Sequence, residues 1–264
     1  MNSLYTKVLE AAGATASLKV TAIHIATGDI ENNKSAKFGA IELEDGTVGL
    51  TYTRLGDALT RLQDEALYQG FIGKPVSELA ELYLSDEPWQ QVLGAAALNG
   101  ISQSLLTQRQ FSYPKSEDSL ALLNIQDGDR VGMVGYFPPL VEQLQQQGIG
   151  VTVIELRRDL AREENGLLVT DDTAKLAQCT KVLITGTTVI NHTLESVLSH
   201  CQNATDVALV GPSVSLLPEL LFEMGITAIG GRAVLNTPAF LERWKSGDKW
   251  KDSVVRYSLR KADY

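Results

Sequence analysis

The sequence predicts a small α+β domain followed by a doubly wound α/β domain with a parallel sheet. Two observations support this prediction. Residues 18–53 alternate in an extended, β-branched pattern around a Glu44-Asp45-Gly46 turn, and helical periodicity follows them. Beyond Arg130, short apolar runs alternate with helical segments, which is the pattern of a parallel sheet covered by helices.

The clearest unit of the second domain runs from Arg130 to Glu155. An apolar run at 131–134 meets a glycine, an amphipathic segment begins at Pro138, and a β-branched run at 151–154 ends at a carboxylate. Proline suits a first helical turn because its missing N–H would have no partner there. A connection this short between two strands predicts a right-handed, parallel βαβ unit.

The first domain is expected to begin with an amphipathic helix over residues 1–16 that ends near Gly13. Extended segments at 18–25, 36–43 and 48–53, with a polar turn from Gly28 to Ser35, predict an antiparallel meander. Two helices should follow. The first covers residues 76–84, with Ser77 as a candidate cap, and the second is an alanine-rich helix over residues 88–106.

A weakly patterned, proline-bearing stretch between residues 108 and 129 predicts the domain boundary. The first domain then spans residues 1–112 and the second spans residues 113–264. Five strands are predicted in the second domain, at 131–134, 151–154, 181–185, 206–210 and 228–229. Beyond the amphipathic segment at Pro138, helices are predicted at 174–178 (capped by Asp171 or Asp172), 193–200, 218–224 and 238–245.

Composition limits the classes of function. The 264 residues carry 23 Lys and Arg against 32 Asp and Glu, and no basic cluster interleaves with aromatic residues, so no nucleic-acid partner is expected. The first residues resemble neither a signal peptide nor a membrane span, and we expect a cytoplasmic protein without a membrane partner. Cys179 and Cys201 form no CxxC motif and are expected to be buried, inert thiols.

Small polar loops follow the predicted parallel strands. The carboxyl ends of such strands meet at one edge of the sheet, where open α/β sheets bind ligands. Glycine lets a ligand approach the backbone, and hydroxyl groups and helix N-termini suit an anionic or carbonyl-bearing group. Gly230 and Gly231 should end the fifth strand. The predicted ligand-binding residues of the loops are Gly135, Tyr136, Phe137, Pro138, Glu155, Thr185, Gly186, Thr187, Thr188, Asn191, Gly211, Pro212 and Ser213.

These residues also have ordinary structural interpretations. Glycine after a strand is common in turns, and Thr187 and Asn191 could equally cap a helix. Glu155 follows Gly135 by 20 residues, the spacing of a ribose-binding carboxylate, but a solvated strand end is an equal interpretation. Aromatic residues and proline stand where a dinucleotide fingerprint needs glycines, which disfavours NAD and leaves a ring system over Tyr136 open.

The sequence offers few metal ligands or catalytic groups. His200 and Cys201 are adjacent, but neighbouring residues on a helix point about 100° apart and cannot share an ion without a bend. No HxxxH, CxxC or GxSxG motif is present. His192 lies beside Asn191 near the predicted site, and its role is left open. Catalytic residues and cofactors are therefore unknown, and no metal ligands are predicted.

Six runs of the sequence resemble a family named for heavy-metal chelation, whose activity is not established. Four of them lie in the second domain: GYFPPL, LITGTTVINHTLE, LVGPSVSLLPELLFEMG and IGGRAV. Two lie upstream and resemble the smaller domain of the same family: FGAIELEDGTVGLTYT and AALNGIS. The resemblance implies an α+β domain with the enolase N-terminal fold, a Rossmann-like α/β domain, and an active-site cleft between them.

The resemblance also implies a link to metal handling, or to metal-chelating compounds of the pterin or flavin kind. Residues at matching motif positions are Asn99, Gly135, Thr187, Asn191, Pro212 and Ser213, and Asn99 would face the cleft from the first domain. Three scattered histidines and two separate cysteines make a poor direct chelator, so we expect the protein to bind a chelating molecule instead.

The sequence therefore predicts a small-molecule-binding protein. In the first hypothesis it is an enzyme of cofactor or metal-chelator metabolism, and in the second it is a non-catalytic carrier of a metal chelate. Polar residues at the strand ends favour the enzyme, whereas the lack of a clear acid, base or nucleophile speaks against it. The expected partner is an anionic or heteroaromatic small molecule, free or metal-bound, and a homodimer is left open.

Overall fold

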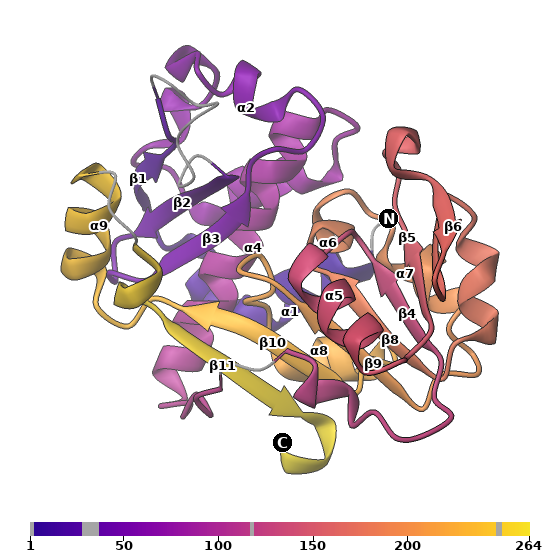
Figure 1. Cartoon of the computed structure of the whole chain (residues 1–264). Coiled ribbons are helices and arrows are strands. Elements are labelled where there is room, and N and C mark those ends of the chain that lie inside the picture. Colours follow the sequence, from indigo (N-terminus) through magenta and orange to yellow (C-terminus); the bar gives the residue numbers. More distant parts are fainter. Residues whose placement is uncertain (1–2, 28–36, 117–118, 247–249) are drawn as a thin grey trace.

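The computed structural model describes residues 3–27, 37–116, 119–246 and 250–264 (Figure 1). The predicted polar turn from Gly28 to Ser35 lies outside these residues. The first helix ends at Ala12 and passes into a 3-10 helix at Gly13, and a three-stranded antiparallel sheet in the order β1-β2-β3 confirms the predicted meander. The bounds are α1 (Ser3–Ala12), η1 (Gly13–Ser17), β1 (Val20–His24), β2 (Phe38–Leu43) and β3 (Val48–Tyr52).

Short helices lead from this sheet to α4, which lies between the small sheet and the large one (Figure 1). Every residue of α4 from Gln91 to Leu106 is buried, so the helix is enclosed on all of its sides. Ser77 does not cap α3, because Pro75 precedes that helix and no side chain bonds to its first turn. The bounds are α2 (Ala58–Arg61), η3 (Glu65–Leu67), η4 (Gln69–Phe71), α3 (Val76–Ala80), η5 (Glu81–Leu84) and α4 (Pro88–Gln108).

The large sheet has eight strands in the order β11-β10-β9-β8-β4-β5-β7-β6. Six strands are parallel, and β6 and β11 run antiparallel to them at the two edges. The chain starts at β4, adds β5 and β7 on one side, and then adds β8, β9 and β10 on the other. The bounds are β4 (Val131–Val134), β5 (Val151–Ile154), β6 (Arg162–Glu164), β7 (Leu167–Thr170), β8 (Lys181–Thr185), β9 (Asp206–Val210), β10 (Ala228–Ala233) and β11 (Val255–Arg260).

The connections between the parallel strands contain helices, as expected, apart from the β6-β7 hairpin turn. Pro138 is the first residue of α5, and the Asp172 carboxylate accepts a hydrogen bond from the Ala174 N–H at 3.0 Å to cap η8. The α-helices are α5 (Pro138–Gln146), α6 (Thr187–Ile190), α7 (Leu194–Ser199), α8 (Pro218–Glu223) and α9 (Thr237–Ser246). The 3-10 helices are η6 (Ala121–Leu123), η7 (Arg158–Leu160), η8 (Thr173–Gln178), η9 (Trp250–Ser253) and η10 (Lys261–Asp263).

The prediction of five strands in the second domain is incomplete. Strands β6 and β7 form a hairpin around Asn165 and Gly166, whose φ angles of 47° and 76° belong to a type I′ turn. Strand β11 was also missed. Strand β10 continues past Gly231 to Ala233, because its last residues pair with β11. Glycine is needed at position 231, where a Cβ would lie 2.4 Å from the Tyr257 ring.

The two predicted domains share packed surfaces. Helix α4 covers one face of the small sheet, and α9 from the C-terminal part of the chain covers the other (Figure 1). On that second face, Phe240, Trp244 and Trp250 form one apolar cluster with Val48 and Leu50 of β3. The boundary at residue 112 stays a prediction. No helix in the described part of the chain combines the length and apolar character needed to cross a bilayer.

The contact between β3 and α4 leads to a prediction for Gly49. A Cβ there would lie 2.1 Å from the Ala96 carbonyl oxygen and 2.5 Å from the Gly100 nitrogen, so Gly49→Ala forces the sheet off the helix. We expect the free energy of unfolding in urea to fall by about 3 kcal/mol. The exposed Gly70 has no atom within 4 Å of an added Cβ, and Gly70→Ala should change stability little. Equal stability of the two variants would contradict this packing.

Candidate functional site

Four of the predicted loops lie at one edge of the large sheet. Gly135, Glu155, Gly186 and Gly211 directly follow β4, β5, β8 and β9, which are neighbouring parallel strands. Their common edge, predicted from sequence, is confirmed. The order in which strands are added reverses between β4 and β8, and such a switch point leaves a crevice beyond the strand ends.

Glu155 links the loops that follow β4 and β5. Its carboxylate accepts hydrogen bonds from the Tyr136 N–H at 3.2 Å and from the Arg157 N–H at 3.1 Å. Gly135 has a φ of 88°, a left-handed conformation that turns the chain out of β4 and toward α5. The carboxylate therefore has a structural task, and it remains partly exposed.

A residue that sequence reasoning missed joins this loop. Arg162, at the start of β6, donates a hydrogen bond to the Tyr136 hydroxyl at 2.7 Å, and its guanidinium carbon lies 5.3 Å from the centre of the ring. This contact fixes the tyrosine over the end of β4. The Asn165-Gly166 dipeptide is typical of a hairpin turn, and the hairpin that it indicates would have placed Arg162 beside this loop.

The loop after β8 holds both partly exposed and buried groups. The Thr187 hydroxyl lies 3.2 Å from that of Thr185, and both residues are partly exposed. In contrast, Thr188 is 3% exposed and donates to the Thr185 carbonyl at 2.7 Å. Gly186 is buried, and a Cβ there would lie 2.4 Å from a methyl group of Val214, so its glycine is required by packing.

Asn191 and His192 shape the turn between α6 and α7. The Asn191 side-chain oxygen accepts hydrogen bonds from the Thr193 N–H at 3.3 Å and the Thr193 hydroxyl at 2.7 Å. His192 has a φ of 60°, and its ring packs 4.5 Å from that of Tyr83, centre to centre. Burial lowers the pKa of His192, which keeps the ring neutral at pH 7. Because Tyr83 belongs to η5, the ring contact packs this histidine against that helix.

The loop after β9 is bonded to α4 and β3. Asn99 is 1% exposed, and its amide donates to the carbonyls of Leu50 at 2.8 Å and Ser213 at 3.0 Å. Its side-chain oxygen accepts the Ser215 N–H at 3.2 Å. The Ser213 hydroxyl accepts the Tyr52 N–H at 2.8 Å. Asn99 and Ser213 therefore hold the small sheet against the loop after β9, with Pro212 partly exposed beside them.

The end of β3 contributes two further polar residues that sequence reasoning missed. Burial raises the pKa of the Tyr52 phenol, the positive charge of Arg54 opposes that shift, and the negative charge of Glu155 adds to it. The phenol is therefore protonated at neutral pH. Because the charges of Arg54 and Glu155 both act on the Tyr52 phenol, the end of the small sheet lies within electrostatic reach of the loop after β5.

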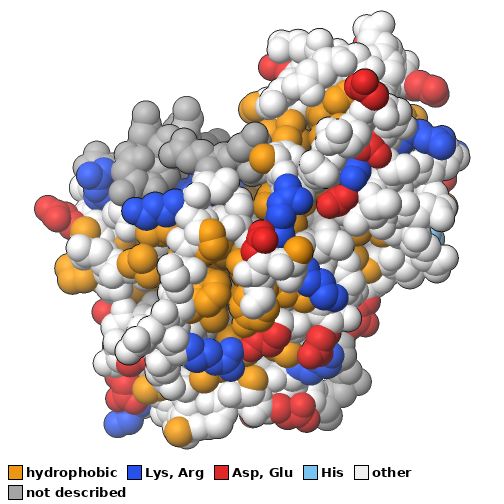
Figure 2. Space-filling model, turned by 90° about the horizontal axis from the view of Figure 1, so that it is seen from below, with side chains coloured by type: hydrophobic (Ala, Val, Ile, Leu, Met, Phe, Trp, Pro, Cys, Tyr) orange, Lys and Arg blue, Asp and Glu red, His pale blue; other side chains and the backbone are white. Residues whose placement is uncertain are grey.

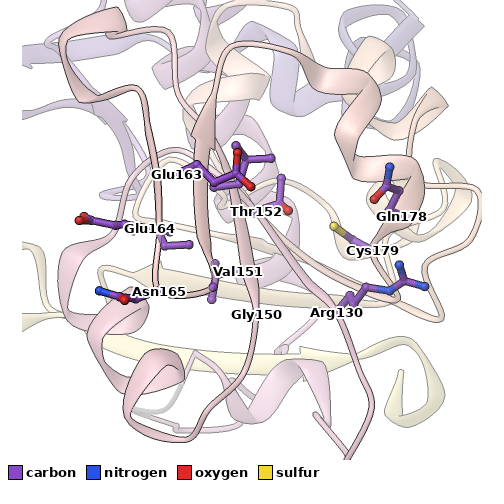
Figure 3. Close-up of a pocket in the computed structure, with 12 residues that line it drawn as sticks. Arg130, Gly150, Val151, Thr152, Glu163, Glu164, Asn165, Gln178 and Cys179 are labelled. Carbon is purple, nitrogen blue, oxygen red and sulfur yellow. The ribbon is translucent and has the colours of Figure 1, made fainter.

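A cavity of about 460 Å³ lies at the opposite edge of the large sheet (Figure 3). It surrounds the first residues of β5 and β7, with Glu163 on one side and Arg130 and Cys179 on the other. Cys179 is 2% exposed, and burial raises the pKa of its thiol, so it supplies no thiolate at neutral pH. Neither this cavity nor a second one beside α9 contains a predicted site residue.

The available donors do not fit a heavy-metal ion bound directly to protein. Within the described residues, no three His, Cys, Asp or Glu side chains gather in a way that could hold a metal. Cys201, like Cys179, is buried, and its pKa is raised to about 11 by burial. Soft-metal sites require convergent thiolate or imidazole ligands, which this arrangement lacks.

The chain belongs to the family described as "Putative heavy-metal chelation". Models of that description match residues 34–102 and 118–261, which confirms the resemblance drawn from the motifs. An uncharacterized protein of Methanocaldococcus jannaschii is 30% identical over 217 residues, covering 78% of this chain and 81% of that protein.

Two solved structures share the fold. A protein of unknown function from Pyrococcus horikoshii superposes with a TM-score of 0.70 at 20% identity, covering 97% of this chain and 99% of the other. A protein of unknown function from Desulfitobacterium hafniense superposes with a TM-score of 0.71 at 22% identity, covering 97% of this chain and 100% of the other. The arrangement of both sheets is thus common to these proteins.

The hydrogen bonds of Asn99 lead to a prediction about stability. Asn99→Ala leaves the Leu50 and Ser213 carbonyls and the Ser215 N–H without this partner in a buried setting. We expect the free energy of unfolding, measured in urea, to fall by about 3 kcal/mol. Thr107 lies at the exposed end of the same helix, so the free energy of unfolding of Thr107→Ala should lie within about 0.5 kcal/mol of the parent's. An Asn99→Ala protein as stable as the parent would contradict this role.

Proposed function

We propose that the chain binds an anionic or heteroaromatic small molecule at the carboxyl edge of its large sheet, and that heavy metal reaches it as a chelate of that molecule. The observation that carries this proposal is the meeting of both sheets at the switch point. There, the Tyr52 N–H donates to the Ser213 hydroxyl in the loop after β9, and the Tyr52 phenol lies within electrostatic reach of Arg54 and of Glu155 in the large sheet. The absence of a direct metal-ligand cluster among the described residues favours a chelate over a bare ion.

Exposure divides the predicted residues into two groups. We assign ligand contact to those that keep exposed surface, namely Gly135, Tyr136, Phe137, Pro138, Glu155, Thr185, Thr187, Asn191, Gly211 and Pro212. We place the buried residues behind the site as its supports, namely Asn99, Gly186, Thr188 and Ser213. Tyr52, Arg54 and Arg162 join the first group. A guanidinium and a phenol are suitable donors for an anionic ligand, and the Tyr136 ring is a surface for a planar one.

The finer features of the fold belong to the same proposal. The strand order of the parallel part, β7-β5-β4-β8-β9-β10, is that of a Rossmann-like sheet, which supports the expected fold of the second domain. The enolase N-terminal likeness of the first domain rests on the motif resemblance. A cytoplasmic location stays a prediction, and a homodimer is left open.

Catalysis is a second candidate function, and one observation favours it. The protonated phenol of Tyr52 near Glu155 and Arg54 could polarise a carbonyl or a ring nitrogen of a bound chelator. Such an enzyme of chelator or cofactor metabolism would convert a pterin- or flavin-like compound, whereas a carrier would release it unchanged. Mass spectrometry of a bound compound before and after incubation distinguishes the two.

Surface charge supports a small-molecule partner over a nucleic acid. On the face drawn in Figure 2, basic side chains lie among acidic and hydrophobic ones and form no continuous stripe. The sequence has a net charge of -9, which opposes association with a phosphate backbone.

The first test compares a free metal ion with its chelate. The probes are Ni²⁺ alone and Ni²⁺ complexed by pyridine-2,6-dicarboxylate, an anionic heteroaromatic chelator. We expect Ni²⁺ or Zn²⁺ alone to bind at about 10 μM or weaker, because convergent ligands are lacking. The nickel complex should bind at least about tenfold more tightly in calorimetry. Stoichiometric, submicromolar binding of the free ion, abolished by the chelator, is the contrary result.

The second test uses the loop after β8. Thr187→Val keeps the volume of a partly exposed side chain and removes its donor, so affinity for the nickel complex should fall by about tenfold while stability barely changes. The adjacent Thr188→Val is a matched control, because that hydroxyl is buried and bonded to the Thr185 carbonyl. It should lower the melting temperature and leave affinity per folded molecule unchanged.

Asn191→Ala completes the comparison. Loss of the two bonds from Thr193 should lower stability by about 1 kcal/mol, and loss of the side-chain amide should also weaken binding. If Thr187→Val and Asn191→Ala both lower stability and leave affinity for the nickel complex unchanged, this loop only caps the turn and does not belong to the site.

A further inference from the structure

A second cavity, of about 770 Å³, lies beside the C-terminal helix α9. Its walls come from the end of β10, from α9, from the start of β11 and from residues 115–116, which pair with β11. None of these residues belongs to the proposed chelate site. The volume is in the range of pockets that hold cofactor-sized molecules.

The charge of this cavity is opposite to that of the protein. Four basic residues line it, and no aspartate or glutamate occurs among the described lining residues; the basic four are Lys115, Arg232, Arg243 and Arg256. The chain has only 23 Lys and Arg against 32 Asp and Glu, so this concentration of positive charge departs from its composition. A site of this kind attracts anions even though the whole molecule repels them.

Two of the arginines stand directly opposite each other. Arg232 on β10 and Arg256 on β11 are register partners in the antiparallel ladder, and like charges in that position destabilise a sheet. Arg256 donates to the Ser119 hydroxyl at 2.7 Å, and the Arg232 guanidinium carbon lies 5.5 Å from the centre of the Trp250 ring. These contacts help to orient the guanidiniums, and Arg232 has a further partner within the chain. An anion between the two arginines would add a favourable contact to both.

The rest of the wall is apolar. Leu235 is 61% exposed, and Ala239, Val254 and Val255 lie around the same cavity. A surface of this kind can cover the organic part of a ligand whose charged part meets the arginines. Planar guanidinium groups bind phosphate oxygens in pairs, which makes phosphate the anion that best matches this set.

We propose that this cavity binds a small molecule that carries a phosphate or diphosphate group. The phosphate lies against Arg232, Arg243 and Arg256, and the organic body lies along Leu235 and the two valines. Arg232 and Arg243 also have partners within the chain, and the phosphate adds a contact to those that these arginines already make. This second site is independent of the chelate site.

The test is calorimetry at low ionic strength with three probes: inorganic pyrophosphate, adenosine diphosphate and adenosine. We expect saturable, one-to-one binding of pyrophosphate, at least equal affinity for adenosine diphosphate, and much weaker binding of adenosine. The double variant Arg243→Gln with Arg256→Gln removes two exposed cations and should weaken both phosphate probes by about tenfold or more.

A matched double variant, Arg61→Gln with Lys74→Gln, removes the same charge from the surface of the small domain. Its affinity for pyrophosphate and adenosine diphosphate should lie within about twofold of the parent's. Thermal melting of both variants checks that they fold. The proposal is overturned if the parent shows no saturable binding of pyrophosphate, if adenosine binds as tightly as its diphosphate, or if the two double variants lose affinity equally.

Discussion

The structure depends on a helix that is buried on every side. Helix α4 fills the space between the two sheets, and its polar side chains bond to both of them. Asn99 bonds to β3 and to the loop after β9, and Gln103 donates to the Ser215 carbonyl at 3.0 Å in the same loop. Buried polar groups are costly unless they are paired, so these bonds permit one relative placement of the sheets. That placement brings the end of β3 to the switch point.

Much of the fold could be predicted from local pattern. The meander, α4 and the five central strands have strong periodicity, and their chain order is sufficient to predict the parallel sheet. The hairpin of β6 and β7 was missed because Arg162 to Glu164 is short and charged, although Asn165-Gly166 marked the turn. Strand β11 pairs with β10 across the whole of α9, and such a long-range partner leaves no local signal.

The arrangement of the candidate site could be predicted only in part, for a related reason. Strand ends can be located from sequence, so Gly135, Glu155, Gly186 and Gly211 could be placed on one edge. Whether a glycine admits a ligand or a neighbouring side chain depends on tertiary packing, and Gly186 faces Val214. Tyr52 and Arg54 could not be assigned because they come from the other sheet. The proposal of a bound chelator rests on the family's description and on the lack, within the described residues, of three His, Cys, Asp or Glu side chains that could hold a metal.

Hydrogen-exchange mass spectrometry with and without the nickel complex of pyridine-2,6-dicarboxylate tests the central claim most directly, because it locates the ligand as well as detecting it. The account predicts slower exchange in peptides covering residues 52–54, 135–138 and 185–191, at the junction of the two sheets. Protection confined to the cavity around residues 163–168 and 178–179, or no protection at saturating complex, would contradict it.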